Sequence, residues 1–152
     1  MLKSTYPGQV CSVARSLEVV GERWTLLILR DALLDLRRFD QFQESLGVAS
    51  NVLSARLERL CAEGLLERRV YQERPPRHEY VLTEKGRALG PAVIMLMKWG
   101  DRYYAGEEGP PRLTLHRGCG GEVDDRLRCT RCRERVDFSE LAVERGPAPV
   151  SG

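Results

Sequence analysis

The stretch from Gly47 to Arg69, GVASNVLSARLERLCAEGLLERR, constrains the fold of this chain more than any other. Ser50 is a favourable helix N-cap and Gly64 a favourable C-cap, which predicts a helix of about four turns between them. At about 100° per residue one face of this helix is apolar and the opposite face is small or polar. The apolar face consists of Leu53, Leu57 and Leu60, with Cys61 at its edge, and the other of Asn51, Val52, Ala55, Glu58 and Arg59.

The polar face of this predicted helix has the residue types that read base pairs. Asn and Arg side chains form bidentate hydrogen bonds with the edges of adenine and guanine, and small residues let a helix approach the bases. We therefore interpret the helix as one that enters the major groove of DNA. Taken alone, this stretch could also be an ordinary solvent-exposed helix face. The neighbouring segments are therefore needed to choose between the two interpretations.

The segments before Gly47 favour a helix-turn-helix. Apolar residues recur at helical spacing from Gln9 to Val20, and a nearly all-round apolar helix, ERWTLLILRDALLDL, follows Gly21 as the central core helix. Phe39, Phe42 and Leu46 then mark a short helix that Gly47 ends. Because the next helix begins three residues later, the order is helix, tight turn, helix.

The residues after Leu65 change from helical to strand periodicity. Leu65 to Gln72 alternate in facing, and RHEYVLT from Arg77 is rich in β-forming residues. QERPPR between them predicts a turn, so the two strands form a hairpin with a basic tip. A hairpin directly after a helix-turn-helix is the wing of a winged helix, in which Arg74, Arg77 and His78 are predicted to contact phosphates. An ordinary charged surface hairpin is the alternative.

A further helix is predicted from Glu84 to about Ala105, with Thr83 as its cap and a bend at Pro91. Apolar residues cover well over half of its circumference, more than one small domain can bury. The surplus predicts packing against a second copy of the chain, and packing within the same domain is the alternative. The apolar arc includes Leu89, Val93, Leu96 and Trp99.

The last forty residues contain four candidate metal ligands in two pairs, His116-x2-Cys119 and Cys129-x2-Cys132. A gap of two residues lets both side chains of a tight turn converge on one tetrahedral zinc ion. Such a segment is too small to fold on a core of its own, so bound zinc would supply the missing folding energy. A degenerate ribbon that has lost its metal is the alternative. Four protein ligands leave no open position, so the predicted site is structural.

Composition narrows the function classes. The formal net charge is only +2 and the tail carries seven arginines against seven acids, so we expect no contribution of the tail to DNA affinity. No apolar run near 18 residues and no signal peptide is present, which predicts a cytoplasmic protein without a membrane partner. The chain has two histidines far apart in sequence and no glycine-rich phosphate loop after a strand, so we expect no enzyme.

The order of these motifs resembles one known family. Residues Cys11 to Tyr104 resemble the HxlR family of bacterial winged-helix transcriptional regulators, and the matching pieces are CSVA, GERW leading into TLLILRDAL, RFDQFQ, LSARLERLCAEGLLERR, RHEYVLTEKGRAL and KWGDRY. The resemblance implies a homodimer, formed by N- and C-terminal helices, on a two-fold operator. Cys11 matches a cysteine that is a thiol sensor in some family members, which makes it a candidate sensor. Because Ala14 stands where an acidic residue is usual, an ordinary structural role is the favoured alternative. The cysteine-bearing tail resembles zinc ribbons of some family members.

The sequence thus predicts a mainly α (α+β) winged helix-turn-helix followed by a small zinc ribbon. The predicted divisions are a DNA-binding and dimerisation domain at 1–106, a linker at 107–112, a ribbon at 113–141 and a disordered tail at 142–152. We expect a homodimeric regulator that binds a palindromic site in double-stranded DNA and responds to a small molecule or an oxidant. A protein-interaction scaffold is the alternative. The predicted DNA contacts are Ser50, Asn51, Val52, Ala55, Arg56, Arg59, Arg74, Arg77 and His78.

Overall fold

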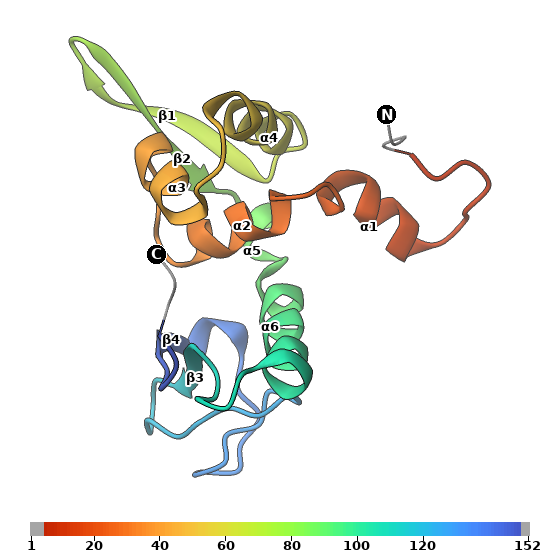
Figure 1. Cartoon of the computed structure of the whole chain (residues 1–152), viewed down its shortest axis with the longest axis vertical. Helices are drawn as coiled ribbons and strands as arrows, with labels where there is room; N and C mark the ends of the chain where they lie inside the picture. Colours follow the sequence, from red (N-terminus) through yellow and green to blue (C-terminus); the bar gives the residue numbers. More distant parts are fainter. Residues whose placement is uncertain (1–4, 150–152) are drawn as a thin grey trace. The chain divides into compact units, whose positions relative to one another are not determined.

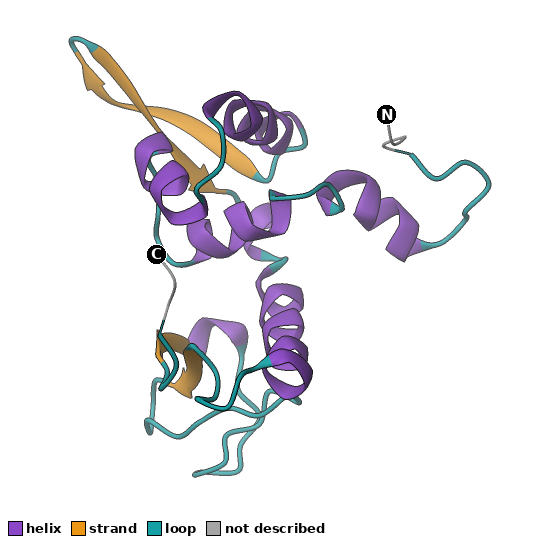
Figure 2. Ribbon diagram, viewed as in Figure 1, coloured by secondary structure: helices purple, strands orange, loops and turns teal. Residues whose placement is uncertain are grey.

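Within the described residues, five helices, the last of them short, and a two-stranded hairpin form the N-terminal part of the chain (Figure 1, Figure 2). In this computed structural model, which describes residues 5–149, the predicted mainly helical winged helix is confirmed. The elements in order are α1 (Ser12–Val20), α2 (Thr25–Leu33), α3 (Phe39–Leu46), α4 (Ser50–Ala62), β1 (Leu66–Glu73), β2 (Pro76–Leu82) and the short α5 (Glu84–Arg87). None of the helices in the described part of the chain is long and apolar enough to cross a membrane.

The core of this first unit, Met1–Leu89, is built from the apolar faces that the sequence pattern predicts. Ile28 and Leu29 of α2 and Phe42 of α3 are fully buried, which makes α2 the central core helix. Burial of side chains of this size stabilises a fold by about 1.5–3 kcal/mol each. Three leucines of α4 join the same cluster with no exposed surface: Leu53, Leu57 and Leu60.

The turn between α3 and α4 depends on Gly47. Its backbone lies in the left-handed region (φ 61°), where a glycine has no steric cost, and its N–H donates to the Gln43 carbonyl. The predicted N-cap of α4 is one residue too late, because Ala49 occupies the cap position and Ser50 begins the helix without a side-chain cap bond. The α4 axis is therefore set by the leucine face and this turn.

The wing is an antiparallel hairpin that extends beyond the helices (Figure 1). Its register pairs Leu66 with Leu82 at the base and Glu73 with Pro76 near the tip, and it shifts between Val70 and Gln72. Both leucines at the base are buried in the core, whereas most of the remaining strand residues are exposed or half-buried. A short β-hairpin that leaves so much surface exposed fits a contact surface better than a core element.

The single helix predicted from Glu84 to Ala105 is interrupted in the structure. Helix α5 ends at Arg87, and α6 (Gly90–Tyr104) begins three residues later. Pro91 therefore lies in the first turn of α6, where its missing N–H removes no intrahelical bond, and it does not bend a helix interior. The break at Leu89 is also where the chain divides, since the second unit is Gly90–Gly152.

The second unit combines α6 with the cysteine-bearing segment. Strand β3 (Arg112–His116) pairs with β4 (Leu141–Arg145), and the 3-10 helix η1 (Phe138–Glu140) leads into β4. Two isolated bridges, Val123 with Cys129 and Arg128 with Arg135, join the loops between these strands. Ile94 of α6 is buried in the same apolar cluster as Val123, Cys129, Val136 and Leu141.

Two sequence-based boundaries differ from this arrangement. Helix α6 groups with the ribbon, whereas the sequence placed it in a domain ending at residue 106. The predicted disordered tail is wrong over 142–145, because these residues form β4 and continue the ladder from Leu141. The apolar run from Leu141 to Val143 is compatible with a strand, but the strand forms only with β3 as its partner. Residues 1–4 and residues 150–152, the end of the predicted tail, lie outside the described residues.

Candidate nucleic-acid interface and metal centre

Helix α4 presents its predicted polar face to solvent. Asn51, Ala55 and Arg59 are exposed, and Ser50 at the start of the helix is exposed with them, whereas Val52 is half-buried against the core. The Arg59 guanidinium pairs with the Glu63 carboxylate at 2.9 Å. A surface pair of this i, i+4 type contributes about 0.3–0.5 kcal/mol, so Arg59 can exchange it for a base edge.

Arg56 differs from the other predicted DNA contacts. Its Nη1 lies 2.6 Å from a Glu22 carboxylate oxygen, and its Nε donates to the Arg23 carbonyl at 3.0 Å. These contacts attach α4 to the segment between α1 and α2. The structure therefore gives Arg56 a positioning role. The sequence did not reveal it, because its partners lie more than thirty residues away.

The wing carries exposed cations along its length. Arg74 and Arg77 are exposed at and beside the tip, and His78 is half-buried with its Nδ1 3.2 Å from Nη2 of Arg68. Arg68 is itself exposed and was missed by sequence reasoning, although its place on an alternating basic strand was a usable signal. Such side chains along a hairpin provide the positive charge that phosphate contacts require.

The four predicted metal ligands converge. Each residue offers one ligand atom, and the four atoms all lie within 4.8 Å of one another. The residues are His116, Cys119, Cys129 and Cys132. The sulfur atoms of Cys119 and Cys129 are 3.3 Å apart, and His116 Nδ1 lies 3.4 Å from the sulfur atoms of Cys119 and Cys132. Ligands around tetrahedral zinc are about 3.3–3.8 Å apart, so the three thiols and one imidazole fit this ion.

The surroundings of the cluster shift the pKa values of two of its thiols in opposite directions. Backbone N–H groups, first that of Cys132 and then that of Arg131, lower the pKa of Cys129 to about 6, against the opposing effect of burial. The Glu134 N–H favours the Cys132 thiolate, but burial and the neighbouring Cys129 and Cys119 raise the pKa of Cys132 overall. Thiolates are the form that binds zinc.

Two further residues shape the cluster and were not predicted as such. Gly121 has no room for a side chain, because a Cβ there would overlap Cys129 Sγ and the Arg131 side chain. His116 Nε2 lies 3.9 Å from Glu140 Oε1, on the side of the ring opposite to the thiols. A carboxylate behind a ligating histidine fixes the orientation of the ring.

Two cysteines lie outside the cluster. The Cys61 thiol is half-buried beside the core, and burial raises its pKa, which makes it a less reactive thiol. Cys11, the candidate thiol sensor, is exposed and is the N-cap of α1, where its sulfur accepts a hydrogen bond from the Ala14 N–H at 3.3 Å.

The order α3, tight turn, α4 and basic hairpin defines a winged helix-turn-helix protein. The chain belongs to the HxlR-like helix-turn-helix family, whose model matches residues 19–108. The HTH-type transcriptional regulator Mb3122 of Mycobacterium bovis is 49% identical over 136 residues, which cover 90% of this chain and 86% of that protein. YybR of Bacillus subtilis, also named an HTH-type transcriptional regulator, is 34% identical over 65% of this chain and 81% of its own length.

Solved structures show the same fold. PA1607, assigned as a transcription factor, has a TM-score of 0.70 at 38% identity and covers 91% of this chain and 96% of its own. The reduced form of the redox regulator HypR has a TM-score of 0.57 at 33% identity, over 60% of this chain and 92% of its own. The family and its named relatives are transcriptional regulators, which confirms a DNA-binding regulator and confirms that the chain is not an enzyme.

Proposed function

We propose that this transcriptional regulator binds a palindromic operator as a homodimer. The observation that carries the proposal is α4, whose leucine face is buried while Asn51, Ala55 and Arg59 remain exposed in front of a basic wing. In this proposal α4 enters the major groove with Ser50, Val52 and Arg56 at its margins, and Arg74, Arg77 and His78 contact phosphates. Family membership favours this function over the protein-interaction scaffold.

Two apolar stripes support a dimer. On α6, Leu96, Trp99 and Tyr103 are each more than half exposed. On α1 and the residue before its cap, Val10, Val13 and Leu17 are exposed at helical spacing. Exposed apolar stripes of this kind mark interaction surfaces, and a two-fold axis places two recognition helices about 34 Å apart, or one turn of DNA. Leu89 is not part of the α6 stripe, because it packs against the first core.

The proposal also includes a structural zinc ion and a signal. His116, Cys119, Cys129 and Cys132 would hold the zinc, which would stabilise the second unit when bound. Control by an oxidant is supported by the exposed thiol of Cys11 and by the likeness to HypR, which is named a redox regulator. A small-molecule effector is the alternative signal, and the cytoplasm is the compartment in which such a regulator meets DNA.

Selection of genomic fragments by the purified protein tests the operator. We expect one enriched palindrome with half-sites about one helical turn apart. The double variant Asn51→Ala, Arg59→Ala should lose roughly 1–3 kcal/mol of specific affinity per base contact that it removes, whereas Arg87→Ala on exposed α5 should keep it. Enrichment of the same fragments by the double variant would rule out this face. Sedimentation at micromolar concentration tests the dimer directly, and a monomer would contradict it.

A further inference from the structure

The ribbon segregates its charges, although their sum is zero. The ten-residue segment 126–135, called here the knuckle, contains five arginines and a single acid, Glu134. All five arginines are exposed: Arg126, Arg128, Arg131, Arg133 and Arg135. The field near a surface depends on the local distribution of charge, so a neutral tail can still present a strongly positive surface.

Two acids directly before the knuckle make contacts of their own. Asp124 accepts from the backbone N–H groups of Arg126 and Arg128 at 2.8 and 3.0 Å, which closes the turn before the knuckle. Asp125 pairs with Arg102 of α6 at 3.5 Å. Within residues 5–149, none of the knuckle arginines forms an ion pair with a carboxylate.

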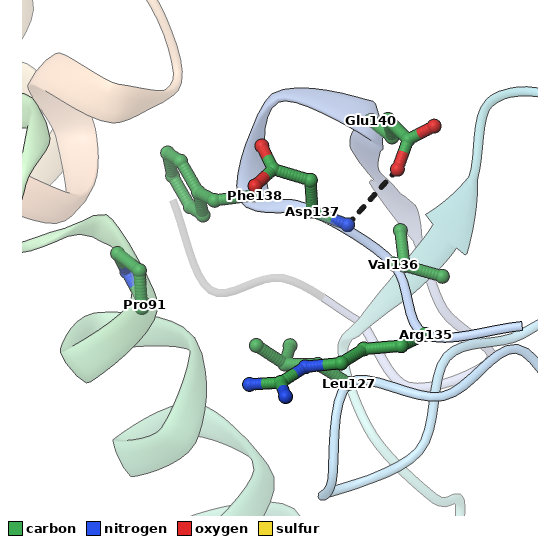
Figure 3. Close-up of a pocket in the computed structure, with 7 residues that line it drawn as sticks. All are labelled: Pro91, Leu127, Arg135, Val136, Asp137, Phe138 and Glu140. Atoms are coloured by element: carbon green, nitrogen blue, oxygen red, sulfur yellow. Dashed lines mark hydrogen bonds between the residues drawn. The ribbon is translucent and has the colours of Figure 1, made fainter.

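Arg135 likewise has carboxylates nearby with which it forms no ion pair (Figure 3). It lines a pocket of about 420 Å³ together with Pro91, Leu127, Val136, Asp137, Phe138 and Glu140. Figure 3 shows its guanidinium apart from the carboxylates of Asp137 and Glu140, which lie on the other side of the loop. Both carboxylates serve η1 instead, because Asp137 accepts from Ser139 and Glu140 accepts from the Asp137 N–H at 2.9 Å.

Two local features of the knuckle work against folding. Arg128 and Arg135 are direct cross-strand partners, and like charges in that position repel each other. Arg133 lies in the left-handed region (φ 65°), where glycine is the residue with the least steric strain. Solvation alone explains an exposed arginine, but it does not explain an arginine placed opposite another or at a position suited to glycine.

We propose that the knuckle is an anion-binding surface for the phosphates of double-stranded DNA. An anion placed between Arg128 and Arg135 would relieve their repulsion, and arginine forms bidentate hydrogen bonds with phosphate. This inference rests on the proposed function, which makes DNA the polyanion that the same chain meets. It replaces the expectation from the summed charge that the tail adds nothing to DNA affinity.

The test uses the full chain and a mixed-sequence DNA duplex, so that it does not depend on an operator. The double variant Arg128→Gln, Arg135→Gln is compared with Arg15→Gln, Arg87→Gln, which removes two exposed arginines that lie outside the knuckle and do not face another arginine. Each phosphate contact adds about 0.9 to the slope of log K against log salt. We expect the knuckle variant to lose about 1.8 per chain from this slope, and the control variant to lose none.

A third variant separates binding from folding. Arg133→Gly relieves the left-handed backbone and removes one charge, so we expect an unchanged or higher melting temperature together with weaker duplex binding. Equal salt slopes for the two double variants would overturn the inference. It would also be overturned if the knuckle variant bound an acidic polypeptide more weakly than the wild type but bound the duplex equally well. Failure of the proposed function is distinguishable, because it appears as an absence of any selected operator.

Discussion

The two units of this chain reach stability in different ways. The first buries twelve apolar residues in one cluster, whereas the second buries five, and one of these five is the metal-ligand candidate Cys129. Folding must offset a conformational entropy cost of about 1–2 kcal/mol per residue, and so small a cluster cannot do this alone. The comparison teaches that hydrophobic patterning specifies the first unit, whereas we expect the second unit to need the metal that its four candidate ligands would hold.

Removal of a ligand should therefore have the largest effect in the chain. Structural zinc contributes an apparent 10–16 kcal/mol in small zinc domains at neutral pH, so Cys129→Ser should unfold the second unit. Because Ile94 of α6 belongs to the same buried cluster as Cys129 and Val123, the loss should reach α6. We expect about one zinc per chain in the wild type and none in the variant, with amide exchange increased over 90–104 but not in α2.

The matched control for this experiment is Cys11→Ser, the same change at an exposed thiol outside the cluster. It should keep the zinc and the protection of α6. Wild-type protein prepared without chelator but free of zinc would contradict the ligand assignment. Protection of α6 that survived the loss of zinc would show that the helix does not depend on the ribbon.

The next largest effect belongs to the first core. Phe42 is fully buried among α2, α3 and α4 residues, and Phe42→Ala should cost about 3–5 kcal/mol through lost burial and the cavity left behind. Denaturant unfolding measures this cost, and metal analysis of the same samples should show unchanged zinc. Loss of zinc together with the first core would mean that the two units unfold as one.

The sequence was sufficient for the first unit because its signals are local and periodic. The leucines of α4 repeat at helical spacing, Gly47 ends α3, and the strands of the wing alternate around a proline turn. These features predict the elements and the exposed face with Asn51 and Arg59. The spacing of the two ligand pairs likewise predicted the cluster that the structure brings together.

The remaining features arise from contacts between residues distant in sequence. No local pattern indicates that Glu22 forms an ion pair with Arg56, or that the Glu140 carboxylate lies near His116 Nε2. The same is true of β4, which is a strand only because β3 lies beside it, and of α6, whose Ile94 is buried by residues at least twenty-nine positions away. The summed charge of the tail also concealed the arginines of the knuckle.

A smaller effect tests how tightly α6 meets the ribbon. Gly90 lies against the ring of Phe138, and a Cβ at this position would overlap the ring. Gly90→Ala should therefore destabilise the second unit by about 1–3 kcal/mol, as other overpacked sites do. Gly100→Ala is the control on the same helix, because no atom lies within 4 Å of its Cβ position.

The control should stabilise the chain, since alanine is favoured over glycine inside a helix by about 0.5–1 kcal/mol. Thermal unfolding of the two variants measures both shifts, which we expect to have opposite signs. If Gly90→Ala were as stable as Gly100→Ala, the close contact with Phe138 would be absent in solution. Replacing Phe138 by leucine in the Gly90→Ala background should recover part of the loss.

The smallest effect on stability is expected for Cys11→Ser. The same variant tests whether an oxidant acts on the Cys11 thiol of the first unit or on the thiols of the second. Serine is among the preferred N-cap residues, so Cys11→Ser should keep the α1 cap and change stability by less than about 1 kcal/mol. If Cys11 is the oxidant sensor, mild peroxide should alter the affinity of the wild type for its operator but not that of Cys11→Ser. Release of zinc under peroxide, followed with a metal indicator, would instead report oxidation of the ligand thiols Cys119, Cys129 and Cys132. A response that persists in Cys11→Ser and follows zinc release would move the sensor from the first unit to the second.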